Sequence, residues 1–503
     1  MTGTLRNHYL ARMRRFKQIG VYLAPGLLVG ILASCATFDE SPRGAQRFVA
    51  EAPVVELEEP ADLREILYVS GLGRSLATVG ADGTPGSVLL ESDGFPGFPR
   101  GVITAHSWSP DGEAVVAAVH LRDESGERLE ALYVAREGEE EVVPVYTSGE
   151  VAPFYLYWNP NGEELSFIGG DGSGALFLYV VDLASGEATV AHRGNGSIYW
   201  SWSSDGRTLI THTGGSLREG AGTLRLHTRG SGSFTASVLT VEESSAGRFQ
   251  VPDFANSGDR IAVALRNAQG TSTVAILNSD GTLRRRIADF EGIASLAWSP
   301  NGRYLAYVAG NIRFGGGIVG TLNVVDTERI DQVVSPAPAA TPAALTAAAA
   351  ATPAPAAGGG RESFVATLAT ATEEGTENNA LPTRVLSNFW APDSSAILYF
   401  KPRYINQGDT LQILMEASLW DPEEGESEVL GSFQPADEFL RRVLPFYDQY
   451  ARSSSFWSPD ARQIVFNGVN EEGDQSIFVI DLDDREAGPR EVAEGVVPLW
   501  QPR

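Results

Sequence analysis

The sequence has little of what many chemical functions require. It contains one cysteine, Cys35, in 503 residues, so no disulfide can form within the chain. Lysine occurs only at Lys17 and Lys401, and 64 acidic residues against 38 basic ones give a formal net charge of −26. A surface of this sign disfavours nucleic acid and anionic lipid headgroups, so no nucleic-acid partner is expected.

Motifs that mark common catalytic and cofactor sites are also lacking. No Gly-x-Ser-x-Gly nucleophile elbow occurs, and there is no phosphate-binding loop or dinucleotide fingerprint. The glycine-rich run at residues 169–174 lies where a hairpin loop is expected, so a flexible strand connection explains it. We therefore expect no cofactor and assign no catalytic residue.

Histidine is scarce and scattered. None of the histidines after the first 34 residues has the spacing typical of metal ligands; they are His106, His120, His192, His212 and His227. Three of them, His106, His120 and His212, could still face one mouth of a channel. This arrangement keeps a metal-dependent reaction open as an alternative.

Aspartates recur in the predicted turns and raise the question of calcium. They are Asp111, Asp205, Asp393 and Asp460. Because Asn161, Ser257 and Asn301 occupy the same turn position, hydrogen bonding to the turn backbone explains the set better. We predict no metal site.

The first 34 residues have the pattern of a secretory leader. Residues 1–19 are polar and basic, and residues 20–33 are mostly apolar but too short for a comfortable membrane span. The run Leu-Ala-Ser-Cys that ends at Cys35 closely resembles the bacterial lipobox. The resemblance implies a lipoprotein signal peptide at 1–34, and a lipid on Cys35 that anchors the protein on the periplasmic or cell-surface side of a membrane. An uncleaved N-terminal anchor is the alternative.

Residues 35–62 are acidic and contain proline, which predicts a flexible tether. From residue 63 onward the chain repeats a strand–turn–strand pattern. In the turn, proline sets φ, Asp or Asn bonds its own backbone, and glycine takes a positive φ. The residue before the turn is aromatic in eight copies: Trp108, Trp158, Trp202, Phe254, Trp298, Trp390, Trp457 and Trp500. Such a large apolar side chain can brace one sheet against the next.

Most copies are 43–52 residues apart, with two longer intervals of 92 and 67. A second signature, such as Leu-Tyr-Val-Val-Asp-Leu-Ala-Ser-Gly at 178–186, predicts a third strand and a turn before a fourth strand. A period of about 40–50 residues with four strands is typical of a β-propeller blade. We therefore predict an all-β chain with a single β-propeller at 63–503.

The two ends determine the number of blades. Strands expected at 66–70 and 76–83 have no tryptophan turn before them, whereas Trp500 ends a first strand without a second. Pairing the C-terminal strand into the N-terminal blade would close the ring and give eight four-stranded blades. Seven blades is the alternative if the Phe254 copy is not a full blade.

The two long intervals have different contents. Residues 335–361 are rich in proline and alanine, which predicts a disordered insert at the edge of a blade; a linker between two domains is the alternative. In the other interval, Phe439, Leu440, Val443 and Leu444 share one helical face before a proline. A short helix near 436–450 that caps the ring is therefore expected.

The Trp-Ser-Pro-Asp-Gly turns and the Leu-Tyr-Val-Val-Asp signature resemble the TolB-type, WD40-like propeller repeat. The resemblance covers 63–503 apart from the insert. It implies a propeller fold, which serves in similar proteins as a periplasmic binding scaffold, as a gating domain of prolyl-oligopeptidase-like peptidases, or as a lyase. TolB itself has an additional N-terminal α/β domain, for which we find no counterpart here.

Function on repeat folds usually lies in loops that share one face. The loops at 309–320 and 401–410 and the segment near 436–450 are expected on adjacent blades, where they would form a basic and aromatic patch. Its members are Arg313, Phe314, Lys401, Arg403, Tyr404, Arg441, Arg442, Phe446 and Tyr447. The alternative is that each side chain only packs its own loop.

These observations favour a lipid-anchored extracytoplasmic monomer that binds a protein or peptide of the cell envelope. The alternative is a polysaccharide lyase or hydrolase with histidines and acids at the channel mouth.

Overall fold

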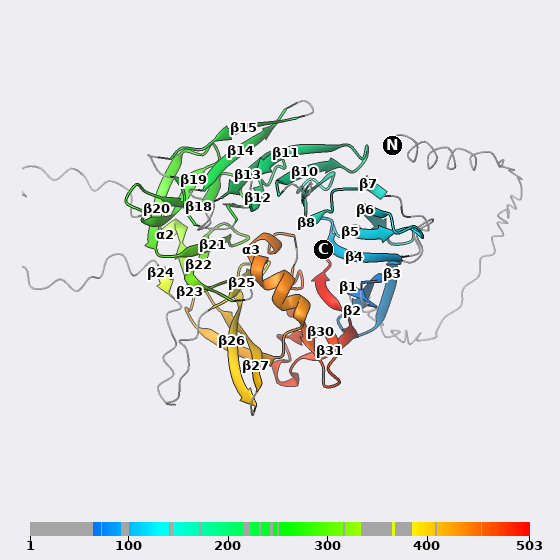
Figure 1. Ribbon diagram of the computed structural model, residues 1–503. Helices are drawn as coiled ribbons and strands as arrows, with labels where there is room; N and C mark the ends of the chain where they lie inside the picture. Colours follow the sequence, from blue (N-terminus) through cyan, green and yellow to red (C-terminus); the bar gives the residue numbers. More distant parts are fainter. Residues whose placement is uncertain are drawn as a thin grey trace, which may run out of the picture. The chain divides into compact units, whose positions relative to one another are not determined.

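The computed structural model describes residues 64–502, apart from 72, 92–99, 140–141, 143, 171–173, 195, 215–221, 231–232, 242–244, 249–250, 315–316, 333–364, 368–384, 408–409 and 454. The leader, Cys35, the tether and most of the interval around the insert lie outside the described residues. Residues 60–503 form one compact unit. That unit is a ring of eight antiparallel sheets (Figure 1), so the predicted eight-bladed β-propeller is confirmed.

The first four blades follow one plan, in which each strand pairs with the next. Blade 1 contains β1 (Glu65–Ser70), β2 (Ser75–Gly80) and β3 (Pro85–Glu91), together with β32 (Val496–Trp500). Blade 2 contains β4 (Arg100–Trp108), β5 (Ala114–Arg122), β6 (Arg128–Arg136) and β7 (Pro144–Ser148). Blade 3 contains β8 (Phe154–Trp158), β9 (Glu164–Gly170), β10 (Leu176–Asp182) and β11 (Ala188–Gly194). Blade 4 contains β12 (Ile198–Trp202), β13 (Thr208–Thr213), β14 (Thr223–Arg229) and β15 (Phe234–Val238).

The other four blades vary this plan. Blade 5 contains β16 (Ser245–Ala246), β17 (Asp253–Phe254), β18 (Arg260–Arg266), β19 (Ser272–Asn278) and β20 (Leu283–Phe290). Blade 6 contains β21 (Ile293–Trp298), β22 (Tyr304–Phe314), β23 (Gly317–Asp326) and β24 (Val365–Thr367), with α2 (Thr327–Gln332) after β23. Blade 7 contains β25 (Ser387–Trp390), β26 (Ile397–Gln407), β27 (Thr410–Trp420) and β28 (Ser427–Phe433). Blade 8 contains β29 (Gln463–Val469), β30 (Gln475–Asp481) and β31 (Arg490–Glu494), with the 3-10 turn η5 (Arg485–Ala487).

The C-terminal strand closes the ring as expected. β32 pairs antiparallel with β1, placing Trp500 opposite Ile66 and Leu499 opposite Leu67. The main-chain N–H of Gln501 also donates to the carbonyl of Glu65 at 2.9 Å. This pairing covers the edge of β1, which would otherwise be open to another strand.

Most of the recurring tryptophans join their blade to the one before it. In five blades the indole N–H donates to the carbonyl of the residue that precedes the neighbouring anchor. These bonds run from Trp108 to Leu499 (3.3 Å), Trp158 to Ser107 (3.4 Å), Trp298 to Asp253 (3.1 Å), Trp390 to Ala297 (3.2 Å) and Trp457 to Phe389 (3.1 Å). The anchor therefore combines apolar packing with a hydrogen bond that the phenyl ring of Phe254 cannot make.

Two blades have an inner strand made of two separate pieces. In blade 5, β16 and β17 both pair with β18, which makes the Phe254 copy a full blade. In blade 8, Pro435 bridges to Gly468 and Trp457 bridges to Ile464, on the same strand β29. Residues 436–455 connect these two pieces of blade 8. We call them the central segment.

Candidate functional site

The central segment is helical but changes its winding twice. It forms the π-turn η3 (Phe439–Val443), the 3-10 turn η4 (Leu444–Phe446) and the α-turn α3 (Tyr447–Tyr450). Pro445 has no N–H to donate to a preceding carbonyl, which explains why a regular α-helix does not continue through it. The helix expected near 436–450 thus corresponds to these three turns, and Figure 1 shows them in the middle of the ring.

Apolar side chains on one side of the central segment are buried. Phe439, Leu444 and Tyr447 are each 1% exposed and belong to a core cluster formed with blades 7, 8 and 1. Phe439 meets the ring of Phe400 edge-on at a centroid distance of 5.4 Å. Burial of this kind stabilises the segment by about 25 cal/mol for each Å² of apolar surface, so it is an integral part of the fold.

Polar contacts tie the segment to the opposite side of the ring. Gln449 exchanges two hydrogen bonds of 3.3 Å with the main chain of Trp200 in blade 4. Tyr447 is hydrogen-bonded through its hydroxyl to Ser295 in blade 6. Arg452 donates to Asp253 and to the carbonyl of Phe254 in blade 5; the latter contact is 2.8 Å long. The segment therefore bridges several blades across the centre.

Asp448 is the buried acid of this segment. It is 4% exposed, and its Oδ2 accepts a hydrogen bond from the main-chain N–H of Val251 at 3.3 Å. Burial raises the pKa of Asp448 to about 7, because it penalises the charged carboxylate; backbone hydrogen bonds oppose the shift. The group consequently titrates near neutral pH.

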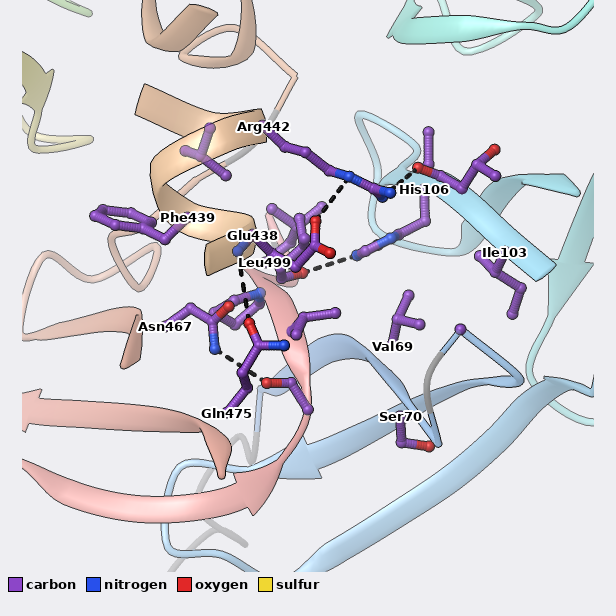
Figure 2. Close-up of a pocket in the computed structure, with 18 of the residues that line it drawn as sticks. Val69, Ser70, Ile103, His106, Glu438, Phe439, Arg442, Asn467, Gln475 and Leu499 are labelled. Carbon is purple, nitrogen blue, oxygen red and sulfur yellow. Dashed lines mark hydrogen bonds and ion pairs between the residues drawn. The ribbon is translucent and has the colours of Figure 1, made fainter. Parts of the chain in front are cut away.

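A cavity of about 630 Å³ lies beside the central segment, between blades 1, 2 and 8. Figure 2 shows Phe439, Glu438 and Arg442 of the segment on one side, Val69 and Ile103 on the other, and Leu499 of the closing strand between them. The cavity is thus built where the two ends of the propeller meet.

The polar groups of the cavity wall are mostly held in place. Arg442 pairs with Glu438 at 2.7 Å and donates to the carbonyl of Thr104 at 3.1 Å. His106 bonds through Nε2 to the carbonyl of Val497 at 2.9 Å. Burial lowers the pKa of His106 to about 4, so its imidazole is neutral at neutral pH.

Val497 has an unusual backbone conformation at this wall. Its φ is 52°, in the left-handed region that β-branched residues rarely adopt. Such conformations cost about 1–3 kcal/mol and tend to occur at functional sites. Val497 is both the strained residue and the residue whose carbonyl is bonded to His106. The strain therefore lies in the wall of this cavity.

The residues of the predicted patch lie in different surroundings. Lys401 and Arg403 both face the buried carboxylate of Glu416, with Lys401 Nζ at 3.9 Å. Tyr404 follows them on β26 and is 44% exposed. Arg313 and Phe314 belong to the hairpin β22–β23, but their side chains lie outside the described part.

The remaining patch residues belong to the central segment. Arg441 pairs with Asp437 at 3.4 Å, and Arg442 lines the cavity. Phe446 packs against the ring of Tyr155 at 5.0 Å, and Tyr447 is buried inside the ring. The structure therefore groups Lys401, Arg403 and Tyr404 on one hairpin and places Arg442 beside blade 2, whereas the burial of Tyr447 comes from packing that only the tertiary structure reveals.

The described histidines do not gather at one site, although His192 and His227 are in contact. His120 pairs with Glu130 on the hairpin β5–β6, His212 is buried in blade 4, and the rings of His192 and His227 lie 5.2 Å apart. Among the described residues, no group of three or more His, Cys, Asp or Glu side chains could hold a metal ion. Within the same residues, no helix has the length and apolar character needed to cross a membrane.

Comparison with known proteins gives likenesses of fold. No family model matches the chain, and no curated protein matches it. TolB from Acinetobacter baumannii is similar to it, with 20% identity, a TM-score of 0.33, and coverage of 53% of this chain and 61% of that one. An oligogalacturonate lyase from Vibrio parahaemolyticus is 11% identical, with a TM-score of 0.40 and coverage of 78% and 86%. A putative TolB from Agrobacterium tumefaciens is 20% identical, with a TM-score of 0.30 and coverage of 48% of this chain and 83% of that one.

These values concern the fold alone. The ring of eight sheets is the eight-bladed β-propeller expected from the repeats.

Proposed function

We propose that the protein is a lipid-anchored, extracytoplasmic scaffold that binds a protein or peptide of the cell envelope through the hairpin β26–β27. The observation that supports this proposal is the length of the hairpin. Its ladder runs from Ile397 opposite Trp420 to Gln407 opposite Thr410. Its neighbours are shorter, since β25 pairs only with 397–400 and β28 only with 415–420. The rest of the hairpin is a two-stranded arm beyond the four-stranded part of blade 7.

The arm carries exposed apolar side chains. Tyr404 is 44% exposed and Ile405 is 40% exposed, and they are adjacent on β26. Successive residues of a strand point to opposite faces, so each face of the arm presents one of them. Tyrosine is frequent among residues that dominate binding energy at protein interfaces. A protein or peptide partner fits such an arm better than a small polar ligand would.

The cations at the base of the arm support its position rather than contact a partner directly. Arg403 and Lys401 surround Glu416, whose side chain is 2% exposed. A buried carboxylate left without these partners would be strongly destabilising. We therefore leave both cations unchanged when testing the arm, and we change only residues at 404 and 405.

The binding test is an affinity pull-down from native membranes with the full chain as bait. Tyr404→Ser combined with Ile405→Ser should lower recovery of a captured envelope protein at least tenfold. Val429→Ser is the matched control, because Val429 is 57% exposed on the outer strand of the same blade. Equal recovery with the arm variant and the control would overturn the proposal.

The anchoring part of the proposal is tested separately. Labelling with a radioactive fatty acid should mark the natural protein and should fail with Cys35→Ser. Label that persists in the variant would contradict the assignment of Cys35, whatever the pull-down shows.

A further inference from the structure

The cavity between blades 1, 2 and 8 has the dimensions of a binding site. Its volume of about 630 Å³ is within the range of about 300–1,000 Å³ found for ligand pockets. Val69, Val102 and Val496 contribute apolar wall, and Val102 is 47% exposed at the surface. The site can therefore take a group with an aliphatic stem.

The charges around this cavity are mostly negative. Three acidic residues line it: Glu438, Asp474 and Glu494. Arg442 is the one positively charged residue of the described lining, because His106 is neutral. Arg442 forms an ion pair with Glu438. Neither Asp474 nor Glu494 forms an ion pair with another described residue. Two exposed carboxylates thus remain uncompensated beside the opening, on a protein whose net charge is −26. Such a field attracts cations.

The interior of the cavity offers hydrogen-bond acceptors. Asn467 is 1% exposed and donates through Nδ2 to the carbonyls of Ser476 and Gly495, but its Oδ1 has no partner in the described part of the chain. His106 donates from Nε2 to a carbonyl, so the other nitrogen of its neutral ring is an acceptor. A buried acceptor without a donor costs about 1–3 kcal/mol, and a donor-rich ligand would remove that cost.

We propose that this cavity binds a basic side chain, a lysine or arginine presented by the partner protein. The aliphatic stem would contact the valine wall, as long cationic side chains do on apolar surface. The charged head would lie near Asp474 and Glu494, and a donor that reached the wall would meet the acceptors of Asn467 and His106. This inference rests on the proposed binding of a protein or peptide and adds the chemistry of one contact. It places that contact beside the ring closure, in addition to the arm of blade 7.

The test uses three capped tripeptides with a central lysine, norleucine or glutamate between two glycines, with binding to the full chain followed by saturation-transfer NMR. Norleucine keeps the stem of lysine and removes its charge. The lysine peptide should bind at least about fivefold more tightly than the norleucine peptide, and the preference should fade at high salt. Equal binding of the two peptides, preference for glutamate, or no binding at all would each overturn the inference.

Variants locate the binding. Asp474→Asn with Glu494→Gln should weaken lysine-peptide binding by roughly five- to tenfold, since exposed ion pairs contribute modestly each. Asp483→Asn with Asp484→Asn removes the same charge from a solvent-exposed turn of blade 8 and should change nothing. Val102→Trp should block the cavity without a charge change and abolish binding.

A thermal unfolding curve for each variant checks that it is folded. Unchanged binding in the Asp474/Glu494 variant would refute the site. If the arm variant loses its captured partner while the lysine peptide does not bind, the proposed function stands and this inference fails.

Discussion

Asp448 should make the stability of the ring depend on pH in a way that a single substitution can reveal. Its pKa is raised by burial from 3.8 to about 7. In the unfolded chain the carboxyl releases its proton near pH 4, whereas the folded protein keeps it up to about pH 7. Stability from this group is therefore present at low pH and is lost as the pH rises through 7.

The magnitude follows from the two pKa values. A tenfold change in proton affinity corresponds to about 1.4 kcal/mol. Raising the pH from 5 to 8 should therefore lower the free energy of unfolding by roughly 2–3 kcal/mol through Asp448 alone. Asp448→Asn removes this dependence. The amide can accept only one of the two main-chain hydrogen bonds, from Val251 and Gln449, and loses about 1 kcal/mol for the other.

We accordingly expect Asp448→Asn to be less stable than the natural protein at pH 5 and more stable at pH 8. Chemical denaturation at several pH values between these limits measures the difference. Burial lowers the pKa of His106, His192 and His227 to about 4. These three groups therefore lower the free energy of unfolding of the protein as the pH falls below 6.5. Their effect is common to both proteins and cancels in the difference. A difference that does not change with pH would refute the reasoning.

Three further predictions concern the ring itself. Trp457→Phe should lower the free energy of unfolding by about 2–3 kcal/mol, because it removes the buried hydrogen bond to Phe389 and leaves a void. Trp420 is also buried but is not one of the recurring tryptophans that bond to the preceding blade. Trp420→Phe should therefore cost less in the same denaturation assay. Ala461→Gly should raise the melting temperature and add about 1 kcal/mol to the free energy of unfolding, since Ala461 has a φ of 61° where other copies of the turn have glycine. Ser394→Gly should add less, because the Ser394 hydroxyl accepts a hydrogen bond that glycine would lose. Deletion of residues 496–503 should uncover the edge of β1 and cause association on size-exclusion chromatography, whereas an intact monomer of unchanged stability would contradict closure by β32.

The blades could be predicted because their signals are local. The pattern consists of a tryptophan, a proline-containing turn and an alternating strand, all within about ten residues. Because it recurs eight times, the fold can be predicted even though some copies are weak. Phe254 illustrates the limit, because the pattern did not reveal that its strand is split between β16 and β17. The pairing of both pieces with β18 resolved the choice between seven and eight blades.

The candidate site was harder to predict, because contacts between distant residues determine it. Tyr447 resembled a patch residue, but its hydroxyl meets Ser295, 152 positions earlier, inside the ring. His106 is not spaced from other histidines as metal ligands are. Its place in the cavity wall depends on a contact with Val497, 391 positions later. Nothing in the local sequence around Asn467 indicates that its Oδ1 would be left without a donor.

The amino-acid sequence alone determined the repeating unit, the all-β class and the closure of the ring, since each follows from turn chemistry, strand periodicity and a tryptophan at regular intervals. Only the tertiary structure decided what occupies the centre. The path of residues 436–455 depends on partners in blades 2, 4, 5 and 6. Burial among these partners, which no local pattern encodes, gives Asp448 its raised pKa and leaves the cavity at the ring closure.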